Sequence, residues 1–316
     1  MTAGGSGRVV CVTLNPALDI TYVAQRFVAG EANRVSRVYA QAGGKAVNVA
    51  RLLRQAGHDV VVTGFAGGLV GDEIAGQLDR WAVPHCLIRS AAGSRRTVSA
   101  FSTEDAAATA YNESGPPIAA AEWERFVESF AGLIHGAAGV VLSGSLPAGL
   151  PDDAYRTLAG RAADAGSAAF VDAHAAPLLA ALAAKPTLVK PNEHELAETA
   201  GLAPPVPLPA AADAARRLLA GGAQGAVVSL GARGLLGVLP GMLLLAAPPA
   251  QPGNPVGAGD AALAALVHGH LTAQPWPDRL RRAAAMSAAA VRQPVAGVVD
   301  CGDVAELEAL ITVSEP

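Results

Sequence analysis

Short apolar runs and amphipathic repeats alternate along most of the chain. The runs that are typical of buried strands cover residues 8–13, 58–64, 139–143, 168–172, 187–190 and 226–229. Apolar residues at helical spacing predict helices between Gly44 and Gly57 and over 70–82, 119–134, 152–165, 175–184, 193–200 and 209–220. Strands that alternate with helices in this way predict an α/β fold with a mostly parallel central sheet flanked by helices.

Two segments depart from this alternation. Residues 14–45 and 95–112 alternate weakly between apolar and polar positions, as short, half-exposed strands do, although the run 14–19 by itself predicts a turn. We expect both segments to form a small β lid inserted in one domain over residues 1–316, because no linker divides the chain. Toward the C-terminus the pattern predicts a hairpin over 234–247 and helices over 258–271, 277–292 and 303–313.

Composition and charge narrow the class further. Of the 316 residues, 51% are hydrophobic and 16% are charged, which allows a large core and excludes general disorder. The formal net charge of -4 offers no basic surface for a nucleic acid. The longest apolar stretch, 235–250, is interrupted by Gly and Pro and is too short to span a membrane, and no signal-peptide core is evident. We therefore expect a cytoplasmic protein without membrane or nucleic-acid partners.

Polar residues gather where the predicted strands end. In open α/β sheets, ligands bind at the carboxyl ends of the strands, so we expect the functional site at this edge. The polar or small residues at these strand ends are Asn15, Asp19, Ser143, Gly144, Ser145, Asp172, Lys190, Asn192, Ser229 and Gly231.

The segment Asn254-Pro-Val-Gly-Ala-Gly-Asp260 opens the helix predicted over 258–271. Its two glycines allow a sharp turn that presents N–H groups at a helix N-terminus, which is a favourable site for a phosphate. Asp260 inside that turn is well placed to take a proton from a hydroxyl beside the phosphate. The alternative is an ordinary N-terminal acid stabilised by the helix dipole. A dinucleotide fingerprint is disfavoured, because the segment follows a Pro/Gly loop near the C-terminus.

A second glycine turn, Gly43-Gly44, directly precedes Lys45 and lies close to Asn48. Only three of the 23 basic residues are lysines, so each lysine is informative. In a functional role, Lys45 would bind an anion and Asn48 would bond to hydroxyl groups. The alternative is a turn followed by a helix cap.

Three further features each allow a functional and a structural interpretation. Asn192 and Glu195, one helical turn apart, would order Mg²⁺ and its waters beside phosphates or would form a capping box. The turn over residues 229–234 would bind a nucleotide or close a hairpin. Arg95-Arg96 would recognise a substrate phosphate or lie in solvent.

Together these segments resemble the ribokinase-like PfkB carbohydrate kinases, most closely their 1-phosphofructokinase and tagatose-6-phosphate kinase branch. The resemblance extends from near residue 8 to near residue 300 and implies a ribokinase-like fold, with ATP and Mg²⁺ as cofactors and a sugar phosphate as substrate. The motifs that carry it are residues 13–19, 42–57, 143–147, 190–193, 229–231 and 256–260.

The resemblance also implies roles for individual residues. The catalytic base would be Asp260, and the anion hole would consist of Gly257, Ala258 and Gly259. The ATP contacts would be Lys190, Ser229, Gly231, Gly234 and Asn254, and the residues that hold Mg²⁺ indirectly would be Asn192 and Glu195. The residues at the sugar would be Asp19, Gly43, Gly44, Lys45, Asn48, Arg96 for the sugar phosphate, and Glu113 from a lid strand.

The chain departs from the family pattern at Ala46, at residues 172–175 (Asp-Ala-His-Ala) and at Pro255, where the family usually has Gly, D-T-S-G and Thr. These departures leave the identity of the sugar open. The predicted function is ATP- and Mg²⁺-dependent phosphorylation of a phosphorylated ketohexose. A kinase for an unphosphorylated sugar or nucleoside would leave Lys45 and Arg96 unpaired, and a non-catalytic sugar- or nucleotide-binding regulator would not need Asp260. An exposed lid can also pair across a homodimer, which stays open.

Overall fold

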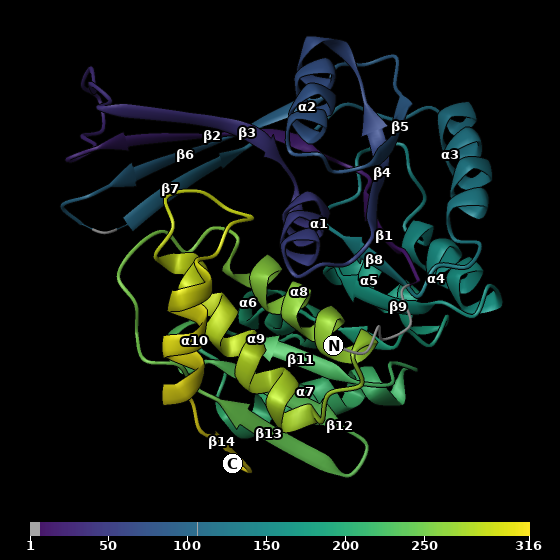
Figure 1. Ribbon diagram of the computed structural model, residues 1–316, viewed down its shortest axis with the longest axis vertical. Coiled ribbons are helices and arrows are strands. Elements are labelled where there is room, and N and C mark those ends of the chain that lie inside the picture. The colour runs from purple at the N-terminus through teal and green to yellow at the C-terminus, as the bar shows by residue number, and fades with distance from the viewer. Residues whose placement is uncertain (1–6, 106) are drawn as a thin grey trace.

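A ten-stranded sheet forms the centre of the computed structural model, which describes residues 7–105 and 107–316 (Figure 1). In pairing order, its strands are β14 (Val313–Ser314), β13 (Met242–Ala246), β12 (Leu235–Leu239), β11 (Ala226–Ser229), β10 (Leu188–Val189), β9 (Ala168–Asp172), β8 (Gly139–Ser143), β1 (Val9–Thr13), β4 (Val60–Ala66) and β5 (His85–Arg89). Every pairing from β11 to β5 is parallel, and β12, β13 and β14 continue the sheet in antiparallel pairings. The carboxyl ends of the parallel strands therefore meet at one edge.

Helices cover both faces of this sheet. The helices on one face are α1 (Lys45–Gln55), α2 (Gly68–Arg80), α8 (Ala258–Leu271), α9 (Trp276–Val291) and α10 (Cys301–Leu310). Those on the other face are α3 (Ala120–Leu133), α4 (Ala154–Asp164), α5 (Ala175–Leu182), α6 (Glu193–Ala200) and α7 (Leu208–Ala220). In β1, Val9 and Cys11 pack in the first core and Val10 and Val12 in the second, because strand side chains alternate between faces. Burial on both faces explains the continuous apolar runs in the sequence.

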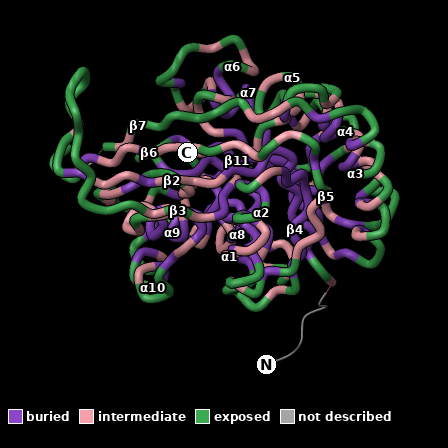
Figure 2. The backbone as a smooth tube through the Cα atoms, turned by 90° about the horizontal axis from the view of Figure 1, so that it is seen from above, coloured by how far each residue is buried: buried purple, intermediate pink, exposed green. Residues whose placement is uncertain are grey.

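A second, four-stranded sheet projects from the body as a lid (Figure 1). In pairing order, its strands are β3 (Arg37–Gly43), β2 (Ala17–Ala24), β6 (Arg95–Ser102) and β7 (Ala107–Asn112). Figure 2 shows that buried positions gather in the body, whereas the outer parts of the lid strands are exposed or half-buried. Val38 on β3 and Tyr111 on β7 are 52% and 63% exposed.

The structure confirms the α/β class, with a mostly parallel sheet, flanking helices and a small β lid. The turn predicted over 14–19 is wrong in its second half, because β2 begins at Ala17. Asp19 lies opposite both Gln41 of β3 and Thr97 of β6, so backbone pairing on both sides holds it in a strand. The last helix ends at Leu310, before the 313 predicted, and Val313–Ser314 pairs with β13 instead.

Within the described residues, we find no helix that combines the length and the apolar character required to cross a membrane.

Candidate active site

A cleft of about 1000 Å³ opens at the carboxyl edge of the main sheet, between the lid and the N-terminal end of α8. The sheet contributes residues that follow β1, β8, β9, β10 and β11, as expected for this class of fold. The residues predicted from the sequence that line this cleft are Asp19, Gly44, Lys45, Asn48, Glu113, Lys190, Asn192, Glu195, Ser229, Gly231, Gly234, Gly257, Ala258, Gly259 and Asp260.

Three predicted site residues do not line the cleft. A Cβ on Gly43 would lie 1.9 Å from Asp19 Oδ2, so Gly43 leaves room for that carboxylate. The side chain of Asn254 is buried in its own loop, where Oδ1 accepts from Val256 N at 3.1 Å and Nδ2 donates to Pro294 O at 3.3 Å. Both residues therefore shape the walls of the cleft from behind.

The third, Arg96, is exposed on the opposite face of β6. Its neighbours Arg95 and Thr97 line the cleft instead, because successive side chains of a strand point to opposite faces. Of the pair, Arg95 therefore lines the cleft in this structure and Arg96 does not.

The N-terminal turn of α8 has the geometry of an anion site. Gly257 adopts a φ of 86°, and a Cβ there would lie 2.6 Å from the Cβ of Ala296, so both its conformation and its surroundings favour glycine. The first N–H groups of a helix lack intrahelical acceptors. The N–H of Ala258 bonds to Pro255 O at 3.2 Å, whereas those of Gly259 and Asp260 have no hydrogen-bond acceptor among the described residues and can bind a ligand.

Lys190 strengthens the positive character of this turn. A Cβ built on Gly259 would lie 3.4 Å from Lys190 Nζ, so the ammonium group lies directly beside the turn. The Lys190 side chain is only 3% exposed. A phosphate at this turn would therefore meet helix N–H groups and a buried cation together.

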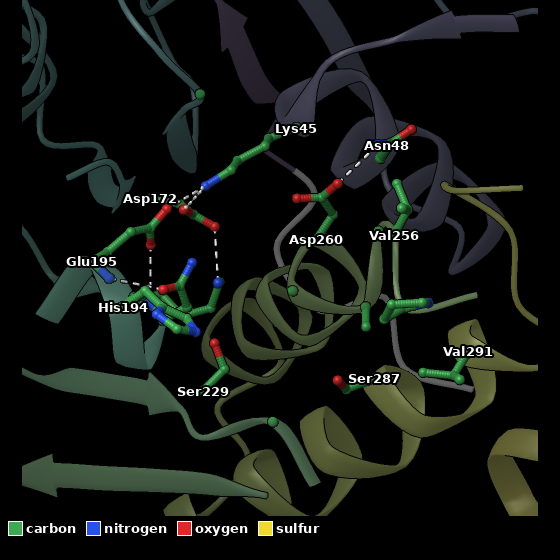
Figure 3. A pocket seen from close by; sticks show the side chains of 18 of the residues that line it. Lys45, Asn48, Asp172, His194, Glu195, Ser229, Val256, Asp260, Ser287 and Val291 are labelled. Carbon is green, nitrogen blue, oxygen red and sulfur yellow. Dashed lines mark hydrogen bonds and ion pairs between the residues drawn. The ribbon is translucent and has the colours of Figure 1, made fainter. Parts of the chain in front are cut away.

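Asp260 is buried at the same turn, and its Oδ2 accepts from Asn48 Nδ2 at 2.8 Å (Figure 3). Burial raises the pKa of Asp260 to about 7, and the negative charge of Asp172 adds to the effect. Lys45, the Asn48 hydrogen bond and Lys190 partly oppose that rise in pKa. A carboxylate with a pKa near the working pH is suited to general base catalysis.

Asp172 ties two lysines together behind Asp260. Its Oδ1 lies 2.8 Å from Lys45 Nζ, and its Oδ2 forms a 2.9 Å ion pair with Lys190 Nζ. Burial works against ionisation of Asp172, but the two ammonium groups outweigh it and hold its pKa below the usual range. Asp172 was recognised in the sequence as a strand-end residue, yet no role was assigned to it. Lys190 follows it at the end of the neighbouring strand, whereas Lys45 lies 127 positions away, so no local pattern in the sequence links the three residues.

Lys45 bridges Asp172 and Glu195, whose Oε1 lies 3.1 Å from Lys45 Nζ (Figure 3). Burial alone would lower the pKa of Lys45, but the two carboxylates raise it above its ordinary value. The anion that Lys45 contacts in this structure is therefore the protein's own carboxylate pair.

Asn192 and Glu195 form the capping box that the sequence left open. Asn192 Oδ1 accepts from Glu195 N, and Glu195 Oε2 accepts from Asn192 N, both at 2.9 Å. The capping box uses only one carboxylate oxygen of Glu195, and the other faces Lys45. Capping and a role at the cleft are therefore compatible in this residue.

The oxygen donors at the cleft fit Mg²⁺, which prefers carboxylate oxygens and keeps several waters. Asp172 and Glu195 lie within one ion-pair network, and the buried Asn48 Oδ1 has no hydrogen-bond partner among the described residues. Residues 7–105 and 107–316 contain no group of three or more His, Cys, Asp or Glu that could hold a metal by itself. A magnesium ion here would therefore share its coordination with phosphates and water.

The lid side of the cleft centres on Asp19. Its Oδ1 accepts from Thr97 Oγ1 at 2.6 Å, and burial raises its pKa above the ordinary value. Arg95 Nε donates to Asn15 O at 3.1 Å, and its Nη1 donates to Glu113 O at 2.9 Å. Glu113 itself accepts from the backbone N–H of Arg96 at 2.8 Å, so it fixes the start of β6.

The opposite end of the cleft is less polar. Gly231 and Gly234 have φ values of 60° and 90° in the turn between β11 and β12, and this turn faces one side of α9. The residues of α9 that line the cleft follow helical spacing, and they are Ala284, Ser287, Ala288 and Val291. The sequence prediction missed this wall, although four small or apolar residues at this spacing are the signal of one helix face.

Residues 9–299 match the sequence model of the pfkB family carbohydrate kinases. The chain belongs to the PfkB family. Two curated relatives of this carbohydrate kinase are named 1-phosphofructokinase. The one from Xanthomonas campestris pv. campestris is 40% identical over 82% of this chain and 83% of its own length. The one from Escherichia coli K12 is 33% identical over 97% of this chain and 98% of its own length.

Solved structures agree with this assignment. The tetrameric inhibited form of phosphofructokinase-2 from Escherichia coli is 25% identical, with a TM-score of 0.87 over 96% of this chain and 99% of its own. Arabidopsis thaliana ribokinase, 19% identical, shares the fold with a TM-score of 0.71 over 96% of this chain and 99% of its own. The fold of the PfkB chain is therefore ribokinase-like.

Proposed function

We propose that this PfkB protein transfers the γ-phosphoryl group of ATP to a hydroxyl of a phosphorylated ketohexose. The observation that carries the proposal is the α8 turn, where Asp260 lies beside the buried ammonium of Lys190 and faces the same cleft as the lid. The names of the two curated relatives support a phosphorylated fructose as the acceptor. Rates would then depend on positioning and charge stabilisation more than on covalent chemistry.

In this proposal, Asp260 takes the proton of the attacking sugar hydroxyl as the oxygen–phosphorus bond forms. The bond between the γ-phosphorus and the bridging oxygen breaks, and ADP leaves with that oxygen. The N–H groups of Gly259 and Asp260, with Lys190, neutralise the charge on the transferred group. Asn48 holds the Asp260 carboxylate through the 2.8 Å bond to Oδ2.

Magnesium, when bound with ATP, would supply additional positive charge that offsets the charge of the phosphates. Asn192, Glu195 and Asp172 would hold it through their oxygens or through water. The turn of Gly231 and Gly234 and the facing wall of α9 would accept the nucleoside end of ATP.

The sugar would lie between the lid and the α8 turn. Asp19 is suited to bonding sugar hydroxyls, and Arg95 is the lid arginine that faces the cleft. An unphosphorylated sugar or nucleoside would leave this guanidinium without an anionic ligand. A non-catalytic regulator would not require a buried acid with a pKa near 7.

A substrate panel tests the proposal directly. We expect kcat/KM to be highest for fructose 1-phosphate, fructose 6-phosphate or tagatose 6-phosphate, and at least about tenfold lower for fructose, since one charge-assisted bond is worth roughly 1.5–3 kcal/mol. ADP release with each sugar and with a set of nucleosides measures this. A preference for a free sugar or a nucleoside would contradict the sugar-phosphate assignment.

Asn192→Ala separates capping from a role toward Mg²⁺. We expect a loss of about 0.5–2 kcal/mol of folding stability from the broken cap, together with a higher Mg²⁺ requirement and a nearly unchanged sugar KM. Asp300 caps α10 through Gly302 N and Asp303 N, so Asp300→Ala is a control that loses a cap elsewhere. Thermal melts and Mg²⁺ titrations of both variants check this. Lost stability with an unchanged Mg²⁺ requirement in Asn192→Ala would leave Asn192 as a cap only.

We also propose that the lid mediates a homodimer. The exposed Val38 and Tyr111 lie on its two edge strands, β3 and β7. No other described strand pairs with the outer edges of these two strands, so their backbone groups can pair with a second copy. Val38→Lys should shift the sedimentation coefficient toward the monomer. Leu69, 87% exposed on α2, provides the control Leu69→Lys, which should leave the assembly unchanged. A wild-type protein that sediments as a monomer would contradict the proposal.

A further inference from the structure

The loop between α9 and α10 packs directly beneath the anion-binding turn. Ala296, 5% exposed, occupies the space that a Cβ on Gly257 would take, at 2.6 Å. Asn254 ties the same loop to the segment before α8 through Pro294 O. The position of the Ala296 peptide therefore sets where the Gly257 turn can lie.

Two side chains hold the carbonyl oxygen of Ala296. Gln41 Nε2 donates to it at 2.9 Å, and Arg51 Nη1 donates to it at 3.2 Å. The same Arg51 nitrogen also lies 3.3 Å from Gln41 Oε1. Gln41 is a lid residue, placed opposite Asp19 in the pairing of β2 and β3. One backbone carbonyl thus connects the lid strand, helix α1 and the loop beneath the anion site.

Arg51 is itself fixed on several sides. Its Cζ lies 3.7 Å from the centroid of the Trp81 ring, at the end of α2, in a cation–π arrangement. It follows Asn48 by three residues, so both lie on the same face of α1. A Cβ on Gly297 would lie 2.8 Å from Asn48 Oδ1 and 3.1 Å from Arg51 Nη1, so the loop contacts both side chains.

We propose that Arg51 is a positioning residue for phosphoryl transfer, which holds the Ala296 peptide and thereby sets the Gly257–Gly259 turn relative to Asn48, Asp260 and the lid. The proposal rests on the proposed function, because it assigns Arg51 an effect on an anion hole. Arg51 lies outside the cleft lining, so its effect is exerted through Ala296 and Gln41.

The test compares Arg51→Met with Arg54→Met, which removes an exposed arginine from the last turn of the same helix. Steady-state kinetics should show a kcat lower by about 10- to 100-fold for Arg51→Met, since small misplacements of catalytic groups have effects of this size. KM for ATP should change less than about twofold, because ATP binding in the ground state uses other contacts. Arg54→Met should match the wild type in both constants.

A binding measurement separates positioning from general stability. Isothermal titration uses ADP, Mg²⁺ and whichever of fructose 1-phosphate, fructose 6-phosphate and tagatose 6-phosphate has the highest kcat/KM in the substrate panel. Run with and without aluminium fluoride, it reports how well the turn binds a mimic of the transferring phosphoryl group. Aluminium fluoride should tighten ADP binding in the wild type, and Arg51→Met should lose about tenfold or more of that gain while binding ADP alone normally. Gln41→Met should lose part of the gain, and the double variant should lose less than the product of the single effects, because both donors hold one carbonyl.

The outcomes distinguish the two hypotheses. No tightening by aluminium fluoride in the wild type would contradict the proposed anion hole and, with it, the proposed function. Tightening that is equal in wild type and Arg51→Met would overturn the role of Arg51 alone. If Arg51→Met fails to fold, Arg51→Lys keeps the charge but loses the planar guanidinium, and the same loss of tightening is then expected from it.

Discussion

Replacing Asp260 by Asn should lower kcat by about 10²-fold or more, the usual scale for removal of a general base. The amide keeps the shape of the side chain, and its oxygen can still accept from Asn48 Nδ2, so ATP and sugar should still bind. Steady-state kinetics and isothermal titration with each substrate check this. If Asp260 were only an N-terminal acid stabilised by the helix dipole, its replacement would not lower kcat in this way. Asp278 is also an acid in a helix first turn, so Asp278→Asn is the matched control and should retain wild-type activity.

The pH dependence of kcat/KM is a second test of Asp260 as the general base. The pKa of Asp260 is raised from 3.8 to about 7, chiefly by burial, so the folded protein keeps this proton until the pH passes 7. The base is the ionised form, and kcat/KM should therefore rise with pH through about 7 and then level off. Asp260→Asn should remove this rise. A variant within a few-fold of wild type, or one with an unchanged pH profile, would exclude Asp260 as the base.

The same raised pKa has a consequence for stability with the opposite sign. An acid that keeps its proton longer in the folded state than in the unfolded state makes folding less favourable as pH rises from about 4 to 7. Asp260→Asn removes that cost, so its melting temperature at pH 8 should equal or exceed that of the wild type. The buried base is thus expected to lower stability in return for activity.

Local patterns were sufficient to predict the α8 turn. Two glycines, a helix start and an acid within seven residues predict a sharp turn at a helix N-terminus. The structure has that turn, with Gly257 at a φ of 86° and Asp260 buried beside it. The same holds for the parallel sheet, because strands buried on both faces are continuous apolar runs. These features depend on neighbours in the chain, which a sequence displays directly.

Features that depend on distant parts of the chain were not predictable in this way. Lys45 pairs with Asp172, 127 positions away, and no local signal distinguishes that contact from a free lysine at the sugar. The strand position of Asp19 depends on pairing with both β3 and β6, and the residues 14–19 alone look like a turn. The proposed role of the Ala296 carbonyl depends on its hydrogen bonds from Gln41 and Arg51, which lie 255 and 245 positions away in the chain.

The sequence also could not show which of the adjacent residues Arg95 and Arg96 faces the cleft. A shift of one position along a strand moves a side chain to the opposite face. Both residues are arginines on β6, so their chemistry could not decide which one faces the cleft. The register of β6 against β2 decides it, by pairing Arg95 with Ala17 and Thr97 with Asp19.

Arg95→Met should therefore raise KM for the preferred sugar phosphate by about tenfold or more, since a lost charge-assisted bond is worth roughly 1.5–3 kcal/mol and 1.4 kcal/mol is a factor of ten. Its side chain reaches the cleft while two of its nitrogens bond to Asn15 O and Glu113 O. The guanidinium is thus held in place for an anionic ligand at low entropic cost. KM for free fructose should change far less, because that substrate carries no phosphate.

Arg96→Met is the matched control, since it removes the same group one residue away on the exposed face. We expect it to leave both KM values near those of the wild type. Arg95→Lys keeps the charge without the planar guanidinium and should lie between wild type and Arg95→Met. If Arg95→Met raised KM for fructose as much as for the sugar phosphate, Arg95 would support the lid through Asn15 and Glu113 without binding phosphate. If Arg96→Met were the variant with the selective loss, the cleft geometry would have assigned the wrong arginine.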